Sequence, residues 1–376
     1  MTATTAGGGL PAEVVAAFAI DGRFVAAERH GNGHINDTWA ASFEGGRVRV
    51  RYLVQRLNAH VFPDPEALVA NIARVTAHVR RRLEAAGLRD VERRVLTLVP
   101  TRAGGHLHRD ERGEAWRAYV FIEGARSHDR AATIEQAREV ARAFGSFQSL
   151  LLDYDGPRLN ETLPGFHDTR RRLATFRDVL ARDAHGRAAA ARADIDFALA
   201  HAELAGCLLD LHVSGELPER VTHNDTKINN VLIDDATGEG LCVIDLDTVM
   251  PGLSLYDFGD LVRTAALTAA EDETDLTRVE VDVGLFAAVA RGWSEALGDA
   301  LLPVERAHLL TAGQLITFET GLRFLTDHLD GDRYFRIRRR GHNLDRCRTQ
   351  FALLRSLEQR ADELRAALAA RRDEVS

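Results

Sequence analysis

The chain has 376 residues, of which 45% are hydrophobic, and a formal net charge of −8. This length and composition indicate two domains or lobes with a sizeable core and exclude an intrinsically disordered chain. The acidic balance, with no long basic stretch, argues against a nucleic-acid partner. The three cysteines form no C-x-x-C pair. We therefore expect no disulfide scaffold and no cysteine zinc site, and a reducing, cytoplasmic location away from membranes.

The first third of the chain has a strand and turn pattern with one long helix. Residues 1–20 are expected to form a flexible tail, and residues 21–124 the first lobe. Strands are expected at 48–57, 95–99 and 116–122. The long helix should begin after Asp64, its N-cap, with Pro65 at its first position. Its apolar face follows the helical spacing of Leu68, Ile72, Val75, Val79 and Leu83.

The remainder of the chain, residues 125–376, is expected to form a second, mainly helical lobe. Helical patterns cover 134–152, 170–180, 195–211 and 305 to the end. Two short strands, 231–233 and 241–244, flank a turn of sequence DDATGEG. A strand-rich first lobe followed by a helix-rich second lobe predicts an α+β fold of two lobes.

The strongest chemical signal runs from His223 to Asn230 and continues after the two short strands to Asp245. Transfer of a phosphoryl group needs a carboxylate to receive the proton of the attacking hydroxyl, oxygen ligands for Mg²⁺ and a cation near the γ-phosphate. Asp225 provides the carboxylate, Asn230 and Asp245 the metal ligands, and Lys227 the cation. The spacing H-x-D-x-K-x-x-N matches the catalytic loop of protein kinases. The alternative is a strand hairpin with ordinary polar flanks.

Three weaker signals lie upstream of this loop. Gly31, Gly33 and His34 precede an expected strand, where exposed backbone N–H groups can cradle phosphates; a tight turn with a structural histidine is the alternative. Arg56 occupies the strand position of the kinase lysine that holds the α- and β-phosphates. Glu66 is either its partner or an acidic residue on a solvated first helical turn.

The last of these signals is the apolar segment Tyr119–Gly124, which ends at the expected lobe boundary. In a kinase this segment is the hinge that binds adenine through its backbone. Phe121, Ile122 and Glu123 are the corresponding candidates here; by itself the segment is an ordinary buried strand.

In this order the motifs resemble those of the aminoglycoside-phosphotransferase-like kinases. The resemblance covers roughly residues 24 to 360, and within the family it extends to kinases that act on N-acetylhexosamines. The segments that carry it are GNGHINDT, LVQRLN, WRAYVFIEG, HNDTKINNVLID, IDLDTVMPGLSLYDFGD, FLTDHLDGDRYF and GHNLDRCRTQF. It implies a protein-kinase-like fold and phosphorylation of a sugar, with an N-acetylhexosamine as the expected acceptor, at the anomeric hydroxyl by ATP with Mg²⁺.

The resemblance also assigns residue roles. It gives Asp225 the base role, Asn230 and Asp245 the metal roles, and Arg323 and Tyr334 the sugar contacts; we add Asp37 to the substrate-binding candidates. The sequence departs from the broad kinase pattern by Arg at 56 and by D-L-D in place of D-F-G.

Other interpretations of the same sequence stay open. The acceptor is alternatively an aminoglycoside, a methylthioribose-like sugar or an amino alcohol, and a cluster of aspartates could serve such a cation. The chain could also be a nucleotide-binding module without catalytic activity. The sequence does not distinguish a monomer from a homodimer.

Overall fold

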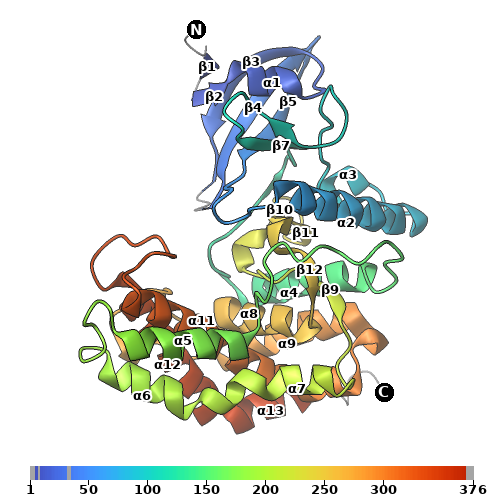
Figure 1. The fold of residues 1–376 in the computed structure, drawn as a ribbon. Helices are drawn as coiled ribbons and strands as arrows, with labels where there is room; N and C mark the ends of the chain where they lie inside the picture. The colour runs from blue at the N-terminus through green and yellow to red at the C-terminus, as the bar shows by residue number, and fades with distance from the viewer. Residues whose placement is uncertain (1–4, 7–8, 32–34, 370–376) are drawn as a thin grey trace. The chain divides into compact units, whose positions relative to one another are not determined.

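The computed structural model describes residues 5–6, 9–31 and 35–369 (Figure 1). The chain divides into two compact units. The sheet unit comprises residues 1–125, 153–163 and 241–250, and the helical unit comprises residues 126–152, 164–240 and 251–376. The sequence assigns everything after residue 124 to one lobe, whereas two short later segments group with the sheet unit. Asp245 therefore belongs to the sheet unit, and Asp225 belongs to the helical unit.

The N-terminal segment is part of the sheet unit's core. It contains the strands β1 (Thr5–Ala6) and β2 (Leu10–Pro11) and the helix α1 (Ala12–Ala17). Leu10, Val14 and Phe18 are spaced four residues apart and are fully buried in one apolar cluster. This corrects the expectation of a flexible tail for residues 9–20, because burying three large apolar side chains outweighs the loss of chain entropy.

The sheet unit is built on a five-stranded antiparallel sheet with the strand order β3-β4-β5-β7-β6. Its strands are β3 (Arg23–Arg29), β4 (Asp37–Gly45), β5 (Val48–Arg56), β6 (His108–Arg109) and β7 (Ala115–Val120). In β4, Trp39, Ala41 and Phe43 alternate onto the core face, as the two-residue period of a strand requires. The strands predicted at 48–57 and 116–122 are confirmed. The one predicted at 95–99 is wrong, since only an isolated bridge joins Leu98 to Tyr119.

The helix α2 (Pro65–Ala85) begins where its capping residue predicts. The side chain of Asp64 accepts a hydrogen bond of 2.8 Å from the amide of Ala67, which satisfies one of the free N–H groups of the first turn. The predicted apolar face is buried along its full length. The short helix α3 (Val91–Arg94) follows after the chain turns at Gly87.

The helical unit contains ten helices among the described residues (Figure 1). They are α4 (Ile134–Leu150), α5 (Thr169–Arg182), α6 (Arg192–Ala200), α7 (Cys207–Val213), α8 (Ser254–Ala265), α9 (Val283–Leu297), α10 (Pro303–Ala307), α11 (Leu309–Leu329), α12 (His342–Gln359) and α13 (Ala361–Ala369). The single helix predicted over 195–211 is interrupted by a 3-10 turn, η2 (Ala202–Gly206). The sequence patterns did not identify α8 and α9. Helix α11 is central, because it packs against α5, α8 and α12.

Two glycines allow the helices of this unit to approach each other closely. A Cβ atom on Gly292 of α9 would lie 2.1 Å from the carbonyl oxygen of Arg138 in α4. A Cβ atom on Gly259 of α8 would lie 2.4 Å from the carbonyl oxygen of Ala312 in α11. These distances are too short for any side chain, so glycine is required at both positions despite its low helix propensity.

The segments around the predicted hairpin are short strands. They are β8 (Ala125–Arg126), β9 (Arg220–Thr222), β10 (Val231–Asp234), β11 (Gly240–Val243) and β12 (Met250–Gly252). The two strands predicted at 231–233 and 241–244 are thus confirmed. Asp234 Oδ1 accepts the amides of Ala236 and Thr237 at 2.9 Å each, which fixes the start of the intervening turn. Across the described ranges, no helix combines the length and the apolar character needed to cross a membrane.

Candidate active site

The loop of residues 223–230 is held by one buried carboxylate on α8. Asp257, which is fully buried, accepts the amide of His223 at 2.9 Å and the amide of Asn224 at 2.7 Å. Its backbone oxygen accepts a third bond, of 2.6 Å, from the hydroxyl of Thr226. Gln148 of α4 donates to the same carboxylate at 2.7 Å. Burial raises the pKa of Asp257, although His223 and the donated amides favour its charged form.

Two buried histidines pack around the 223–230 loop. The His223 ring lies edge-on to Phe144, with 5.2 Å between ring centroids, and its Nδ1 accepts the amide of Asp225 at 3.3 Å. His167 lies 3.1 Å from the carbonyl oxygen of Asn224 through Nε2, and 2.8 Å from Glu319 Oε1 through Nδ1. Both rings are buried and contact backbone atoms of the loop, so they help to hold its conformation.

The structure brings three predicted site residues of this loop together. Lys227 Nζ lies 2.7 Å from Asp225 Oδ1, and the side-chain amide of Asn230 donates to Asp225 Oδ2 at 3.1 Å and to its backbone oxygen at 2.8 Å. Burial by itself would raise the pKa of Asp225, but attraction to Lys227, His223 and Arg263 holds it below the ordinary value. Asp225 is therefore ionised at neutral pH. Its side chain is 25% exposed, so a hydroxyl group can reach it.

A second ion pair lies in α8, one turn after Asp257. Arg263 donates to Asp260 Oδ1 at 2.8 Å, and both residues are buried. Burial alone would lower the pKa of Lys227, but attraction to Asp225 and Asp260 raises it above its ordinary value. The lysine is therefore a fixed positive charge beside Asp225.

In the sheet unit, Asp245 adopts a left-handed backbone conformation with φ 57° and is exposed. Non-glycine residues in this region carry a conformational cost of about 1–3 kcal/mol and cluster at functional sites. Two residues later, Asp247 is buried and forms an ion pair with Arg117 of β7, with 2.5 Å between Oδ1 and the guanidinium. Asn36 donates to the other oxygen of Asp247 at 2.6 Å, and Arg117 donates to Gln55 at 2.9 Å.

Arg56 lies at the end of β5, as predicted, but its ion-pair partner differs from the one expected. It forms an ion pair with Asp37, its cross-strand neighbour, and Asp37 also pairs with Arg29 at 2.6 Å. Glu66 is paired with Arg109 at 2.7 Å, so the pairing of Arg56 with Glu66 is wrong. Among the described residues of this unit, Arg117 is the arginine that is buried, and the sequence analysis missed it. Pairing β5 with β7 in the observed register sets Gln55 opposite Arg117, so knowledge of this register would have pointed to Arg117.

Some backbone groups of the predicted hinge segment form hydrogen bonds with other residues of the sheet unit. The amide of Phe121 donates to the carbonyl oxygen of Arg51 at 3.0 Å, and the guanidinium of Arg51 lies 3.8 Å from the Phe121 ring. Arg93 donates to the carbonyl oxygen of Glu123 at 3.0 Å. Ile122 between them is buried. Of the glycine-rich segment, Gly31 has a positive φ of 74°, while Gly33 and His34 lie outside the described residues.

Arg323 and Tyr334 are brought together by a turn after α11. The carboxylate of Asp327 accepts the amides of Arg333, Tyr334 and Phe335 at 2.8–2.9 Å, which folds the chain back over the helix. The Arg323 guanidinium lies 5.9 Å from the ring of Tyr334, 5.4 Å from that of Phe335 and 5.1 Å from that of Phe166. The sequence analysis missed Phe166, which precedes His167 and so connects this cluster to the 223–230 loop.

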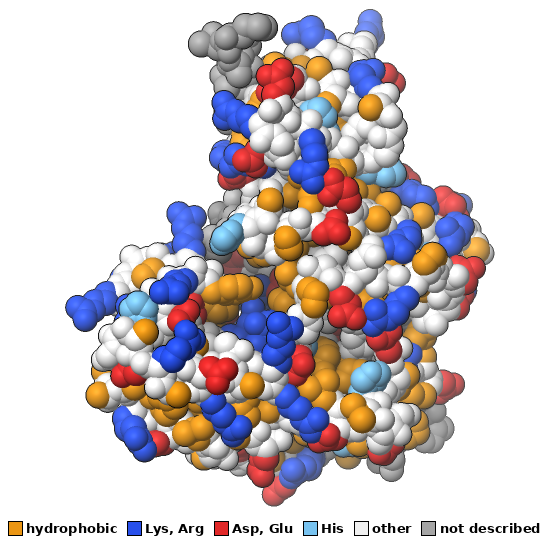
Figure 2. All heavy atoms as spheres, viewed as in Figure 1, with side chains coloured by type: hydrophobic (Ala, Val, Ile, Leu, Met, Phe, Trp, Pro, Cys, Tyr) orange, Lys and Arg blue, Asp and Glu red, His pale blue; other side chains and the backbone are white. Residues whose placement is uncertain are grey.

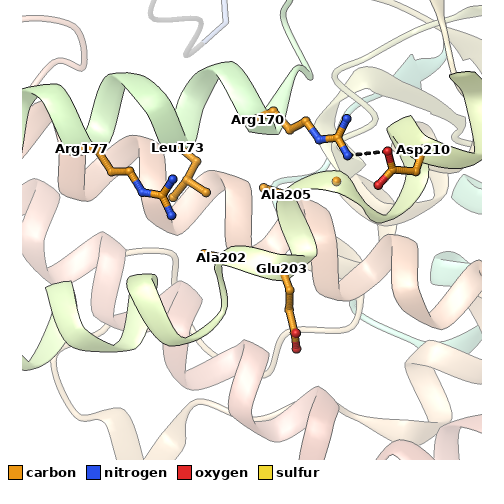
Figure 3. A pocket seen from close by; sticks show the side chains of 8 residues that line it. Arg170, Leu173, Arg177, Ala202, Glu203, Ala205 and Asp210 are labelled. Carbon is orange, nitrogen blue, oxygen red and sulfur yellow. Dashed lines mark hydrogen bonds and ion pairs between the residues drawn. The ribbon is translucent and has the colours of Figure 1, made fainter.

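A pocket elsewhere in the helical unit contains none of the predicted residues (Figure 3). It is lined by Arg170, Leu173, Arg177, Ala202, Glu203, Ala205, Gly206 and Asp210. Arg170 forms an ion pair with Asp210 at its edge, where both side chains are more than half exposed. Exposed pairs of this kind contribute about 0–1 kcal/mol, and we assign the pocket no role.

Figure 2 shows basic and acidic side chains interspersed over the face that it draws.

The two units and the Asp-Lys-Asn loop define the class of kinase-like phosphotransferases. The sequence profile of the phosphotransferase enzyme family matches residues 26–301, and the chain belongs to this family. The predictions of the fold class and of the family are thereby confirmed.

Solved structures of low sequence identity share the fold. An aminoglycoside phosphotransferase from Alicyclobacillus acidocaldarius is 15% identical with a TM-score of 0.57, and the match covers 97% of this chain and 96% of that one. A choline kinase from Cryptosporidium parvum is also 15% identical, with a TM-score of 0.54 and 92% of each chain covered.

We predict that Asp257→Asn loosens the 223–230 loop. An asparagine directs an N–H group at one of the backbone amides that the carboxylate now accepts, and a hydrogen bond to a charged group is worth about 1.5–3 kcal/mol. Hydrogen exchange of peptides spanning 220–232 should accelerate by about 10- to 150-fold. Asp196→Asn, at a side chain on α6 that is 53% exposed, is the control. Equal exchange in the two variants contradicts the role given to Asp257.

Proposed function

We propose that this protein is an ATP- and Mg²⁺-dependent kinase that phosphorylates the anomeric hydroxyl of a hexose, with an N-acetylhexosamine as its acceptor. The observation that carries the proposal is the cluster of Arg323, Tyr334 and Phe166 beside the 223–230 loop. A guanidinium offers a fork of five donors to sugar oxygens, and aromatic rings pack against the apolar face of a sugar ring. The product is the sugar 1-phosphate.

In this proposal the anomeric hydroxyl oxygen of the sugar attacks the γ-phosphorus of ATP, and ADP leaves. Asp225 receives the proton that this hydroxyl loses. Lys227 supplies positive charge beside the phosphate that is transferred. A carboxylate with a depressed pKa remains ionised and so carries no proton of its own, and its contact with Asn230 fixes its orientation.

Asn230 and Asp245 are proposed to hold Mg²⁺. The side-chain amide nitrogen of Asn230 is used in both of its bonds to Asp225, so neither bond occupies the Oδ1 atom that a metal needs. An amide oxygen and a carboxylate are the hard ligands that Mg²⁺ prefers, and nucleotide phosphates usually complete its shell. When bound, the ion would neutralise charge on the β- and γ-phosphates.

The nucleotide is proposed to contact the sheet unit. Gly31, Gly33 and His34 remain candidates for the phosphates, with Arg56, and Phe121, Ile122 and Glu123 for adenine. The Phe121 amide and the Glu123 carbonyl already have partners within the unit. We therefore expect adenine to use other backbone groups of this segment. We also propose that Asp37, which forms ion pairs with Arg29 and Arg56, binds the substrate.

A cationic acceptor, such as an aminoglycoside or an amino alcohol, is the main alternative. It would need free carboxylates around the site, and most candidate aspartates are occupied by protein partners. These pairs are Asp247 with Arg117, Asp257 with the loop amides, Asp260 with Arg263, Asp327 with the turn amides, and Asp332 with Arg187. A non-catalytic module is disfavoured, because Asp225, Asn230 and Asp245 are all present.

The deciding experiment is a ³¹P NMR screen with ATP and Mg²⁺. Free hexoses, N-acetylhexosamines, aminoglycosides and amino alcohols are offered one at a time, and the coupling of the product phosphorus identifies the phosphorylated position. We expect a phosphate on the anomeric carbon of an N-acetylhexosamine. A product phosphorylated at C6, or an aminoglycoside that reacts faster than every hexosamine, contradicts the proposal.

Replacing the proposed base should slow the chemical step selectively. Asp225→Asn keeps the shape of the side chain but cannot take up a proton, and general-base catalysis contributes about 10²–10⁴-fold. We expect kcat to fall by that factor while the dissociation constant for ATP, measured calorimetrically, changes little. Asp196→Asn serves as the control. A variant that retains more than half of the wild-type kcat would rule out this assignment.

Removing the proposed metal ligand should abolish turnover at any metal concentration. We expect activity to vanish with EDTA and to return with Mg²⁺ or Mn²⁺ in the wild type. Asp245→Ala should stay inactive as Mg²⁺ is raised, and its nucleotide should bind with an affinity that no longer depends on Mg²⁺. Asp235→Ala, at a carboxylate paired with Arg126 in the turn after β10, should behave as wild type. Undiminished turnover in metal-free buffer refutes the prediction.

A further inference from the structure

A second arginine lies beside Arg323, and no part of the proposed mechanism uses it. Arg172 is in the first turns of α5, and its guanidinium carbon lies 6.0 Å from the ring of Phe166, which Arg323 also faces. Its terminal nitrogen donates to the carbonyl oxygen of Phe166 at 2.8 Å. Its Nε is buried and has no hydrogen-bond partner within the described part of the chain. A buried donor without an acceptor is costly, and a ligand oxygen would satisfy it.

Within the described ranges, the carboxylate that attracts both arginines beside Phe166 is Glu319, and it already has protein partners. Glu319 lies in α11; its Oε1 is 2.8 Å from His167 Nδ1, and its Oε2 accepts the hydroxyl of Thr169 at 2.6 Å. Burial alone would raise the pKa of Glu319, but His167, Arg323 and Thr169 hold it below its ordinary value. Burial and repulsion from the like charge of Arg323 both lower the pKa of Arg172.

The guanidinium of Arg323 is likewise available to a ligand. Among the described residues it forms no hydrogen bond or ion pair, and it faces the rings of Phe166, Tyr334 and Phe335. The space around Phe166 is thus rich in N–H donors and positively charged. An ammonium group placed there meets two like charges, whereas an amide carbonyl or a carboxylate meets donors.

We propose that Arg172, together with Arg323, selects the acceptor by charge: it donates to an electronegative oxygen on a neutral or anionic sugar and excludes sugars that carry a protonated amine. This inference rests on the proposed function and extends it from Arg323 and Tyr334 to a residue on another helix. It predicts that a hexosamine is accepted when its nitrogen is acylated and rejected when the amine is free and protonated.

The test compares kcat/KM for N-acetylglucosamine with that for glucosamine, at a pH where the free amine is protonated. The ratio of the two values is independent of the fraction of enzyme that is folded, because both acceptors are measured on one preparation. In Arg172→Met we expect the ratio to fall about tenfold, as loss of one nearby charge in a partly buried site implies. Arg172→Lys retains the charge and should keep most of the discrimination. Arg177→Met, on the exposed side of α5, is the matched control and should leave the ratio unchanged.

Each outcome bears on the inference in a defined way. If hexoses are phosphorylated but Arg172→Met leaves the ratio unchanged, or if Arg177→Met lowers it equally, charge selection by Arg172 is wrong and the proposed function stands. If no hexose is phosphorylated by the wild type, the proposed function and this inference fail together. A ratio that falls in Arg172→Met and is restored in Arg172→Lys supports the inference.

Discussion

The conformation of the 223–230 loop in the helical unit depends on the hydrogen bonds that the carboxylate of Asp257 accepts. A loop that turns sharply between two short strands leaves several backbone amides without partners in a ladder, and buried amides without partners are costly. Asp257 accepts two of them and its own carbonyl group accepts Thr226, so three residues before Lys227 are fixed from one position on α8. Gln148, itself bonded to Ser254, completes the network and ties the loop to α4. Removal of Asp257 would leave the amides of His223 and Asn224 without this acceptor.

Helix α11 contributes to the same site through residues that are four positions apart. Glu319, Arg323 and Asp327 lie on one face, because the α-helical period places i, i+4 and i+8 nearly above each other. Glu319 holds His167 against the 223–230 loop, Arg323 faces the aromatic rings, and Asp327 folds the following segment back over the helix. The cluster of Arg323, Tyr334 and Phe166 and the 223–230 loop thus share one rigid support, which in the proposed function would align the acceptor with Asp225.

The sheet unit shows how strand register can override a motif. Arg56 occupies the position where a kinase lysine is expected, yet its pairing partner across the ladder is Asp37, and its side chain is 40% exposed. Neighbouring residues of a strand face opposite sides of the sheet, so Gln55 lies on the face opposite to Arg56 and meets Arg117, its partner in β7. Arg117 is consequently the buried cation that contacts Asp247, two residues after Asp245.

The sequence alone determined the two-part α+β fold, the helix that starts at Asp64, the hairpin strands and the loop of Asp225, Lys227 and Asn230. These features are local, since capping, periodicity and short spacing act within a few residues. It did not determine that residues 9–20 belong to a core, that α8 and α9 are helices, or that Asp257, His167, Glu319, Phe166 and Arg172 lie around the loop. Those residues are separated from the loop by long stretches of sequence, and no local pattern links them to it. Only packing of α5, α8 and α11 brings them together, because a buried polar group finds its partner through the tertiary structure.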